Sequence, residues 1–456
     1  SRAREQRHPD YLCTAIAVLE KDGHACRFLD GAAKDISLKE TRNIFRDFKP
    51  EAVIINATTP SIDSDLGYAK MCKEETSGKV LTLMVGPHVS AEPEDTLRRG
   101  KGSLDAVVRR EYDYTLRELA VSGEVFSLKG ISYIKGNDVV HNPDRPFIED
   151  LDEIPFPAWQ HIDLRDYYSP AKRNPFITVI TGRGCEGKCS FCLFPQVMYG
   201  RKYRPRSSEN VLDEIQRNIR LFPMLKEIMF EDDTFTLKRY RLRMEEICQG
   251  MIERRIKIPW SCNARPDEQD LSVLRLMKKA GCRMMCVGFE SGDENMLLNL
   301  KKGTSPEAMQ RFAGLCRKAG ISVHGCFVIG APGETPESIK KTVKFAASLP
   351  IDTVQFSGLC HYPGTEFYHW CKDNRYLSAN AWREWVDENG EQKAIIDYPN
   401  LSCDAMNKEI DASLYKFYSR PGYILSQIFR PKSFHDIQAR VRGLSNFISH
   451  LLVVRK

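Results

Sequence analysis

One stretch of this chain reads Thr181-Gly182-Arg183-Gly184-Cys185-Glu186-Gly187-Lys188-Cys189-Ser190-Phe191-Cys192 and follows the largely apolar residues 176–180, which are typical of a strand. Its cysteines have a C-x3-C-x2-C spacing, so one tight loop can direct three thiolates at a single inorganic group. Thiolates hold iron–sulfur clusters, and a cubane takes four ligands. The stretch therefore predicts a [4Fe–4S] cluster on Cys185, Cys189 and Cys192, with one iron left open for another molecule.

A zinc knuckle or a chance grouping of cysteines is the alternative. Zinc sites usually show paired C-x2-C or a histidine partner with a fourth ligand, and the residues nearby supply neither. The chain has fifteen cysteines, and Cys282 and Cys286 form the other close pair. They lie in or beside an apolar strand, where we expect buried core thiols and no auxiliary cluster. The odd, unpatterned set favours a reducing cytosol over a disulfide framework.

The composition is that of an ordinary globular protein. With 456 residues the chain can form two or three domains, each with its own core. It is 42% hydrophobic and 28% charged. It has no run of eighteen apolar residues and no signal peptide, so we expect a cytoplasmic protein without a membrane span. The net charge of +6 is modest and gives no argument for nucleic-acid binding.

The first part of the chain is expected to alternate strands and helices, which predicts an α/β fold with a doubly wound parallel sheet. We expect helices at 11–21, 40–48 and 64–72 and strands at 26–29, 51–55, 80–85 and 105–108. Ligands of such sheets lie outside the carboxyl ends of the strands. The loops 58–61 and 86–90 are therefore a candidate binding edge for a large flat ligand.

Proline-dense segments near residues 142–157 break both helix and sheet and mark a domain boundary. We predict an N-terminal domain at 1–145, a linker at 146–175, a second domain at 176–370 and a helical region at 371–456. The second domain shows six βα units. Six units are too few for a closed eight-unit barrel and predict a partial (β/α)6 barrel, whose chemistry lies at the carboxyl ends of its strands.

Candidate site residues follow the ends of these six expected strands. Besides the cysteine loop, they are Glu231, Asp232, Asp233, Asn263, Arg265, Glu290, Ser291, Gly330 and His361. Because parallel strands end at one common edge, we expect these residues to converge near the cluster. An ordinary polar strand end remains the alternative for each residue taken alone.

The cysteine spacing with an aromatic residue inside it resembles the signature of the radical SAM enzymes. The resemblance implies that the open iron chelates S-adenosylmethionine (SAM). One electron from a flavodoxin- or ferredoxin-type donor would then cleave SAM to a 5′-deoxyadenosyl radical. Acidic residues would accept the SAM ammonium, Glu290 and Ser291 the ribose hydroxyls, and Arg265 the carboxylate. The SAM-binding residues implied are Phe191, Glu231, Asp232, Asp233, Arg265, Glu290, Ser291 and Gly330.

The N-terminal domain resembles the cobalamin-binding domain that precedes many radical SAM cores. The cobalamin-binding residues implied are Thr58, Thr59, Pro60, Ser61, Gly86, Pro87, His88, Val89 and Glu111. The family's first strand should precede the helix at 11–21, so we expect this strand to be missing. Arg27 stands where a D-x-H-x-x-G motif that begins at Asp22 needs glycine. The resemblance thus implies cobalamin without a histidine ligand, and a domain that has lost its ligand is the alternative.

The chain also resembles the hopanoid cyclitol-ether ring-contraction and calditol-synthase-like group, which shares a wider group with the magnesium-protoporphyrin ester cyclase. The matching stretches are residues 59–65, 141–146, 191–196, 260–264 and 417–421. The resemblance implies radical remodelling of a hydrophobic or lipid-linked substrate in membrane-lipid biosynthesis. A cobalamin-dependent radical SAM methyltransferase is one alternative, and a non-catalytic cobalamin or cluster sensor is the other.

From residue 412 onward eight basic residues face one acidic residue, with apolar side chains interleaved. Such a segment is typical of a peripheral contact with a membrane surface, and a helix packed on the barrel with a basic outer face explains it equally well. The segment Trp382-Arg383-Glu384-Trp385 stands out without a role. We expect Tyr199, Arg201 and His361 to shape the substrate pocket.

Overall fold

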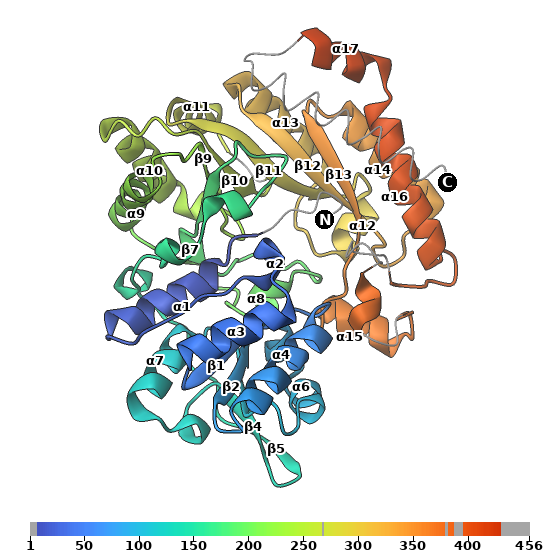
Figure 1. The fold of residues 1–456 in the computed structure, drawn as a ribbon. Coiled ribbons are helices and arrows are strands. Elements are labelled where there is room, and N and C mark those ends of the chain that lie inside the picture. The colour runs from blue at the N-terminus through green and yellow to red at the C-terminus, as the bar shows by residue number, and fades with distance from the viewer. Residues whose placement is uncertain (1–6, 267–268, 379–381, 387–394, 430–456) are drawn as a thin grey trace.

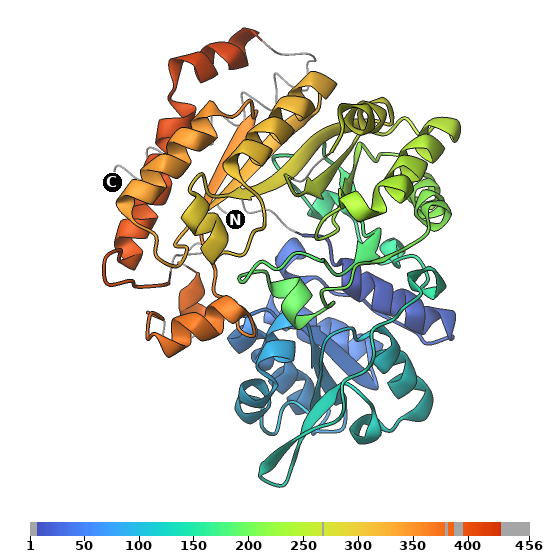
Figure 2. The ribbon, with the colours of Figure 1, turned by 180° about the vertical axis from the view of Figure 1, so that it is seen from behind.

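The computed structural model describes residues 7–266, 269–378, 382–386 and 395–429. A five-stranded sheet forms the lower part of the molecule in Figure 1, and a six-stranded sheet with its helices forms the upper part. Helix α8 (Leu193–Val197) lies between the two parts in Figure 1 and, as the green helix, in the view from behind in Figure 2.

The N-terminal sheet is formed by β1 (Ala52–Asn56), β2 (Leu81–Val85), β3 (Ala106–Val108), β4 (Ile131–Lys135) and β5 (Asp138–His141), in that order. Strands β1, β2 and β3 are parallel, whereas β4 and β5 add an antiparallel hairpin at the β3 edge. The predicted parallel sheet is thus confirmed for β1, β2 and β3, and the two candidate loops follow β1 and β2.

Helices cover both faces of this sheet. They are α1 (Asp10–Lys21), α2 (Gly31–Lys34), α3 (Leu38–Phe48), α4 (Ile62–Glu75), α5 (Pro87–Ala91), α6 (Pro93–Arg99) and α7 (Asp113–Ser122). Successive side chains of a strand point to opposite faces. Leu83 and Val85 therefore join the core under α1 and α7, while Met84 between them joins the core under α4 and α6.

The strand predicted at 26–29 is wrong, because the structure has irregular backbone there. Phe28 packs against the core of the barrel, and the Tyr167 hydroxyl donates to Asp30 over 2.9 Å. These contacts hold residues 26–29 against the second domain, so the segment does not form the sheet strand that its short apolar pattern predicted.

The second sheet contains β6 (Phe176–Val179), β9 (Glu227–Phe230), β10 (Trp260–Ala264), β11 (Cys282–Glu290), β12 (Ser322–Ile329) and β13 (Thr353–Gly358). All pairs in this order are parallel, so the predicted partial (β/α)6 barrel is confirmed. Its outer helices are α9 (Ser208–Leu221), α10 (Arg241–Glu253), α11 (Leu271–Lys279), α12 (Glu294–Asn299), α13 (Pro306–Ala319) and α14 (Pro336–Ser348). One apolar core fills the space between strands and helices.

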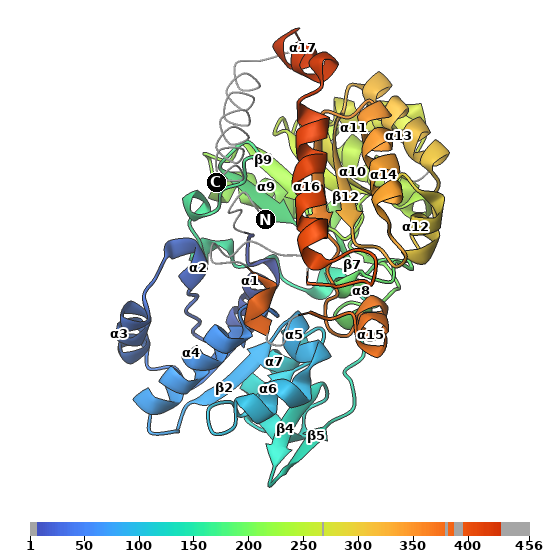
Figure 3. The ribbon, with the colours of Figure 1, turned by 90° about the vertical axis from the view of Figure 1, so that its right-hand side faces the viewer.

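The C-terminal region adds α15 (Glu366–Asp373), α16 (Cys403–Tyr418) and α17 (Pro421–Phe429). Short 3-10 turns occur at η1 (Val125–Ser127), η2 (Leu151–Glu153), η3 (Trp159–His161), η4 (Leu164–Asp166), η5 (Lys238–Tyr240) and η6 (Trp382–Trp385). Figure 3 shows α16 along the open side of the barrel, where it packs on β13 and α14. In the described part of the chain, no helix is long and apolar enough to cross a membrane. Most of the basic tail lies outside the described residues.

Helix α1 connects the two domains. Ala15 packs in the core of the N-terminal sheet, while Cys13 packs in the core of the barrel. At the start of the helix the Thr178 hydroxyl of β6 donates to the Asp10 carboxyl over 2.5 Å. Burial raises the pKa of Asp10 to about 8, with a smaller contribution from the charge of Glu231. This carboxyl therefore carries a proton in the folded chain at neutral pH.

We expect Asp10→Asn to remove a pH-dependent loss of stability. The folded pKa of about 8 exceeds the ordinary value of 3.8, so stability falls as pH rises from 3.8 through 8, by up to ~1.4 kcal/mol per pH unit. The asparagine keeps an oxygen for the Thr178 hydroxyl and does not ionise. In thermal melts across this pH range, the stability of the variant relative to the wild type should increase as pH rises. A difference in melting temperature that stays constant with pH would contradict a raised pKa for Asp10.

Candidate active site

The cysteine loop starts from a small hairpin in which β7 (Gly182–Arg183) pairs antiparallel with β8 (Arg204–Pro205). Gly184 has φ +86°, and a Cβ there would lie 2.3 Å from a backbone carbonyl oxygen across the hairpin. Only glycine fits such a position. The Gly187 amide donates to Cys185 Sγ over 3.4 Å. The backbone between the first two cysteines is thus held close around the first thiol.

Cationic side chains face the three thiols. Arg265 Nη1 lies 3.6 Å from Cys189 Sγ, and the buried ammonium of Lys302 acts on Cys192. Burial raises the pKa of the Cys185 and Cys192 thiols, so they need a metal's positive charge to ionise. No three His, Cys, Asp or Glu side chains of the described residues converge closely enough to hold a single metal ion. Desolvated thiols on one loop, beside two cations, are a donor set that fits an iron–sulfur cluster.

The three acidic residues after β9 lie in different surroundings. Asp232 is buried, and its carboxylate accepts hydrogen bonds from the Thr181 amide over 2.5 Å and the Tyr203 hydroxyl over 3.1 Å. Asp233 is accessible at the barrel mouth but surrounded by protein, and this desolvation, with the charges of Asp232 and Glu231, raises its pKa to about 7. Asp233 therefore has oxygen atoms available for a ligand, whereas Asp232 holds the start of the cysteine loop in place.

The ends of β11 and β12 are fixed by buried polar contacts. Glu290 has φ +66°, which is strained for a residue with a side chain, and its Oε1 accepts from Lys302 Nζ over 2.7 Å. The Ser291 hydroxyl lies 2.8 Å from the Thr342 hydroxyl on α14. The amide of Gly330 donates to a carboxylate in the following loop over 2.5 Å. Ser291 and Gly330 thus hold the strand ends in place, and Glu290 is oriented by Lys302.

Two of the three predicted substrate residues, Tyr199 and Arg201, make contacts within the protein. Tyr199 is 2% exposed and stacks on Tyr11 with ring centroids 4.6 Å apart. The Arg201 guanidinium donates to the Gly187 carbonyl oxygen. Phe191, predicted to meet the adenine of SAM, is half-buried against the barrel core. Among these three residues, Phe191 is the one whose side chain is partly exposed and makes no polar contact.

The candidate cobalamin edge consists of the loops after β1 and β2, which touch each other. Gly86 has φ +107°, and a Cβ there would lie 2.8 Å from the Ala57 carbonyl oxygen. The buried side chains of Thr59 and His88 lie 3.2 Å apart, and burial lowers the pKa of His88 to about 4. Nε2 of His88 has no partner among the described residues. An edge where Gly86 allows close backbone approach, with a buried nitrogen unpaired among the described residues, fits a large flat cofactor. The predicted residues with accessible side chains are Thr58, Pro60, Ser61 and Pro87, whereas Val89 is buried.

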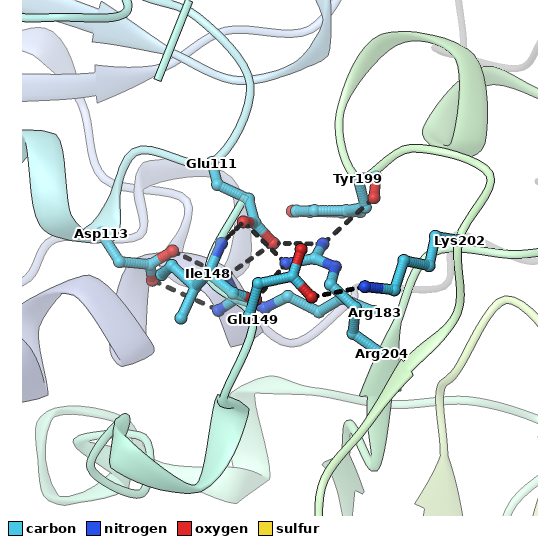
Figure 4. A network of polar contacts seen from close by, with 8 residues as sticks. All are labelled: Glu111, Asp113, Ile148, Glu149, Arg183, Tyr199, Lys202 and Arg204. Carbon is cyan, nitrogen blue, oxygen red and sulfur yellow. Dashed lines mark hydrogen bonds and ion pairs between the residues drawn. The ribbon is translucent and has the colours of Figure 1, made fainter. Parts of the chain in front are cut away.

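Glu111, the remaining predicted cobalamin residue, belongs to a buried ion network between the domains (Figure 4). Its carboxylate binds Arg204 through two contacts, 2.7 and 2.9 Å long, and lies 3.4 Å from Arg183. Asp113 accepts from Arg183 over 2.7 Å, and the Ile148 amide also donates to Glu111. The four charged side chains are at most 5% exposed and sum to zero charge. Glu111 therefore joins the N-terminal domain to the cysteine-loop hairpin.

An aromatic bridge from the C-terminal region was missed by sequence reasoning. The Trp382 ring meets the His88 ring edge-on with centroids 5.3 Å apart, and its indole N–H donates to Asp95 over 3.1 Å. Trp385 lies 4.7 Å from the buried His361 ring, at the end of β13. In the sequence, the one signal for this bridge was the presence of two tryptophans in a polar segment. The bridge and the ion network together show that the carboxyl edges of the two sheets face each other.

Family models match both halves of the chain. Residues 179–346 match the radical SAM superfamily, and residues 5–120 match the B12 binding domain. An uncharacterized methyltransferase of Pyrococcus horikoshii is 31% identical over 433 residues, which are 94% of this chain and 92% of that protein. The chain belongs to the cobalamin-dependent radical SAM enzymes, and its cofactors are a [4Fe–4S] cluster, SAM and cobalamin.

Two further matches extend this result. An anaerobic magnesium-protoporphyrin IX monomethyl ester cyclase of Rubrivivax gelatinosus is 27% identical over 75% of this chain, which spans 62% of that protein. The radical SAM methyltransferase TsrM of Kitasatospora setae, solved with cobalamin and a [4Fe–4S] cluster bound, has a TM-score of 0.71 at 18% identity, over 91% of this chain and 87% of that chain. That likeness confirms the fold. These relatives do not single out the hopanoid or calditol group.

Replacing any of Cys185, Cys189 and Cys192 by alanine should abolish cluster binding, because the cubane would lose one of its three protein ligands. The measurement is iron and sulfide content, with visible absorption, after anaerobic reconstitution. Cys286→Ala is the matched control, since this thiol lies on β11 and outside the cysteine loop, and it should keep full iron content. A loop variant that retained the full iron content would contradict the ligand assignment.

Glu111→Gln should strongly destabilise the joined domains. The substitution leaves two buried guanidinium groups facing one carboxylate, and breaking a buried pair in this way costs about 3–5 kcal/mol. Glu149→Gln is the matched control, because its contact with Lys202 over 2.6 Å is exposed and should matter little. Denaturant unfolding of both variants checks this, and equal midpoints would show that the network does not join the domains.

Proposed function

We propose that the chain is a cobalamin-dependent radical SAM methyltransferase that acts on a small hydrophobic molecule. A relative that matches nearly the whole chain carries the name of a methyltransferase, and so does one of the solved structures that share the fold. A flavodoxin- or ferredoxin-type protein would supply the electrons that the family's chemistry needs.

This proposal rests on one observation, which is that the carboxyl edges of the two sheets face each other. Ligands of parallel sheets and of βα barrels bind at these edges. The loop after β3 brings Glu111 onto the hairpin of the cysteine loop, and the loop after β2 brings His88 onto η6, which also contacts His361 after β13. A corrin on the first edge and SAM on the second would therefore share one chamber with the substrate between them.

The chain's own residues would hold and shield the reactants in this chamber. When bound, the cluster, SAM and cobalamin supply the radical and methyl-transfer chemistry. Arg265 and Lys302 offset the negative charge of the thiolates, and Asp233 offers an acceptor to the SAM ammonium. Trp382 against His88 and Trp385 against His361 would place apolar surface between the two edges, which excludes water from reactive species.

A second candidate is radical remodelling of a lipid-linked substrate, such as ring contraction on a membrane-lipid head group. The cyclase among the relatives favours chemistry other than methyl transfer. Helix α17, which belongs to the basic segment that begins at residue 412, also exposes Ile424 and Leu425, which supports a peripheral contact with a membrane surface.

Feeding methyl-deuterated methionine to a gene-deletion strain and to its complemented counterpart tests the proposal. Untargeted mass spectrometry should find a product that requires the gene and carries the deuterated methyl group. Complementation with Cys185→Ala should abolish this product, and complementation with Cys286→Ala should restore it. A gene-dependent product without deuterium would refute methyl transfer, and such a product that is a remodelled lipid would favour the second candidate.

A further inference from the structure

A cavity of about 860 Å³ lies at the end of the barrel opposite the cysteine loop. Its walls come from the segments that precede β6, β9 and β10 and from the start of β11. These are the amino ends of the strands, whereas the family's cofactors belong to the carboxyl ends. The cavity therefore belongs to neither the SAM edge nor the cobalamin edge.

The lining of this cavity is strongly cationic. Eight of its lining residues are Lys or Arg, and none of the described lining residues is acidic. Three of the eight have partners within the protein. Arg254 pairs with Asp213, Arg283 donates to the Glu227 carboxylate, and Lys172 donates to the Ser261 hydroxyl. In the described part of the chain the remaining five make no side-chain hydrogen bond or ion pair. These five are Arg173, Arg220, Lys226, Arg255 and Lys257.

Helix dipoles explain only part of this charge. Arg220 lies in the last turn of α9, where a cation is stabilised by the helix C-terminus. Arg173, Lys226 and Lys257 lie in connecting segments outside any helical turn. Arg255, with φ +55°, follows the C-cap of α10, where the left-handed residue ends the helix and the helix C-terminus also stabilises a cation. Like charges around one concavity repel each other, so their convergence from three separate connections requires another explanation.

A buried polar plug separates this cavity from the interior of the barrel. The Glu227 carboxylate, which is fully buried, accepts from Arg283 Nε over 2.7 Å, from the Arg173 amide over 2.8 Å and from the Ser261 hydroxyl over 2.6 Å. Lys172 Nζ donates to the same Ser261 hydroxyl over 3.0 Å. A ligand in the cavity is thereby kept out of the chamber where the reaction takes place.

We propose that this basal cavity is a binding site for a small anion that carries several phosphate groups. Ligand pockets typically measure about 300–1,000 Å³, so the volume suits one polyphosphate or nucleotide. Arginine and lysine are the side chains that bind phosphate oxygens most strongly. The Tyr168 ring, 42% exposed at the cavity wall, offers an apolar surface beside the charges. The site is independent of the proposed methyl transfer.

Calorimetric titration of the full-length holoenzyme with tripolyphosphate and with ATP tests the site. Both should bind saturably, and more weakly as salt increases. Lys226→Glu combined with Lys257→Glu should weaken binding about tenfold or more, since both side chains are exposed cavity-wall cations that have no ion pair with any described residue. The matched control is Lys340→Glu with Lys344→Glu, the same charge change on exposed positions of α14, and it should bind as the wild type does.

Three results would overturn the proposal. The first is no saturable binding of either probe, and the second is equal weakening in the cavity variant and the α14 control. The third is binding of anionic vesicles or of an acidic redox protein to the same face while both small probes fail to bind. Far-ultraviolet circular dichroism of the variants ensures that a loss of binding reflects the cavity and not the fold.

Discussion

The buried network of Arg183, Arg204, Glu111 and Asp113 is the contact on which the rest of the site depends. The two arginines face each other across the β7–β8 hairpin, and the same hairpin carries the cysteine loop. The two carboxylates follow β3, at the carboxyl edge of the N-terminal sheet. Desolvated charges of this kind are tolerated only in a geometry that pairs all of them. The network therefore admits one placement of the cobalamin edge relative to the cluster loop.

The two ends of the barrel carry different polar groups. At the carboxyl end, thiols and an accessible carboxylate lie beside Arg265 and Lys302, in surroundings that favour a metal cluster and a cationic cosubstrate. At the amino end, the Glu227 plug closes the interior, and unneutralised cations surround an open cavity. Because the plug lies between them, a ligand at one end does not contact a ligand at the other.

Local patterns in the sequence were sufficient for most of the helices and strands and for the position of the cysteine loop. Apolar periodicity predicted six barrel strands in order, and Ser305 and Gly320 begin and end α13 as their residue types indicate. The failure at 26–29 has a tertiary cause, since Phe28 packs on the other domain. Of the predicted ligand residues, Asp232 and Ser291 bond to their own domain. A polar residue at a strand end has the same sequence signal whether it binds a ligand or holds a loop.

The sequence by itself determined the two α/β domains, the C-x3-C-x2-C loop and the loops at the strand ends, because these depend on periodicity and spacing within short segments. Only the tertiary structure decided that Glu111 pairs with the hairpin arginines, that Lys302 faces the thiols and that Trp382 reaches His88. Each of these contacts joins residues more than seventy positions apart in the chain. The packing of the N-terminal domain on the rest of the chain makes the first and the third, and the fold of the barrel makes the second. Burial and charge neutralisation, which spacing along the chain does not encode, select those partners.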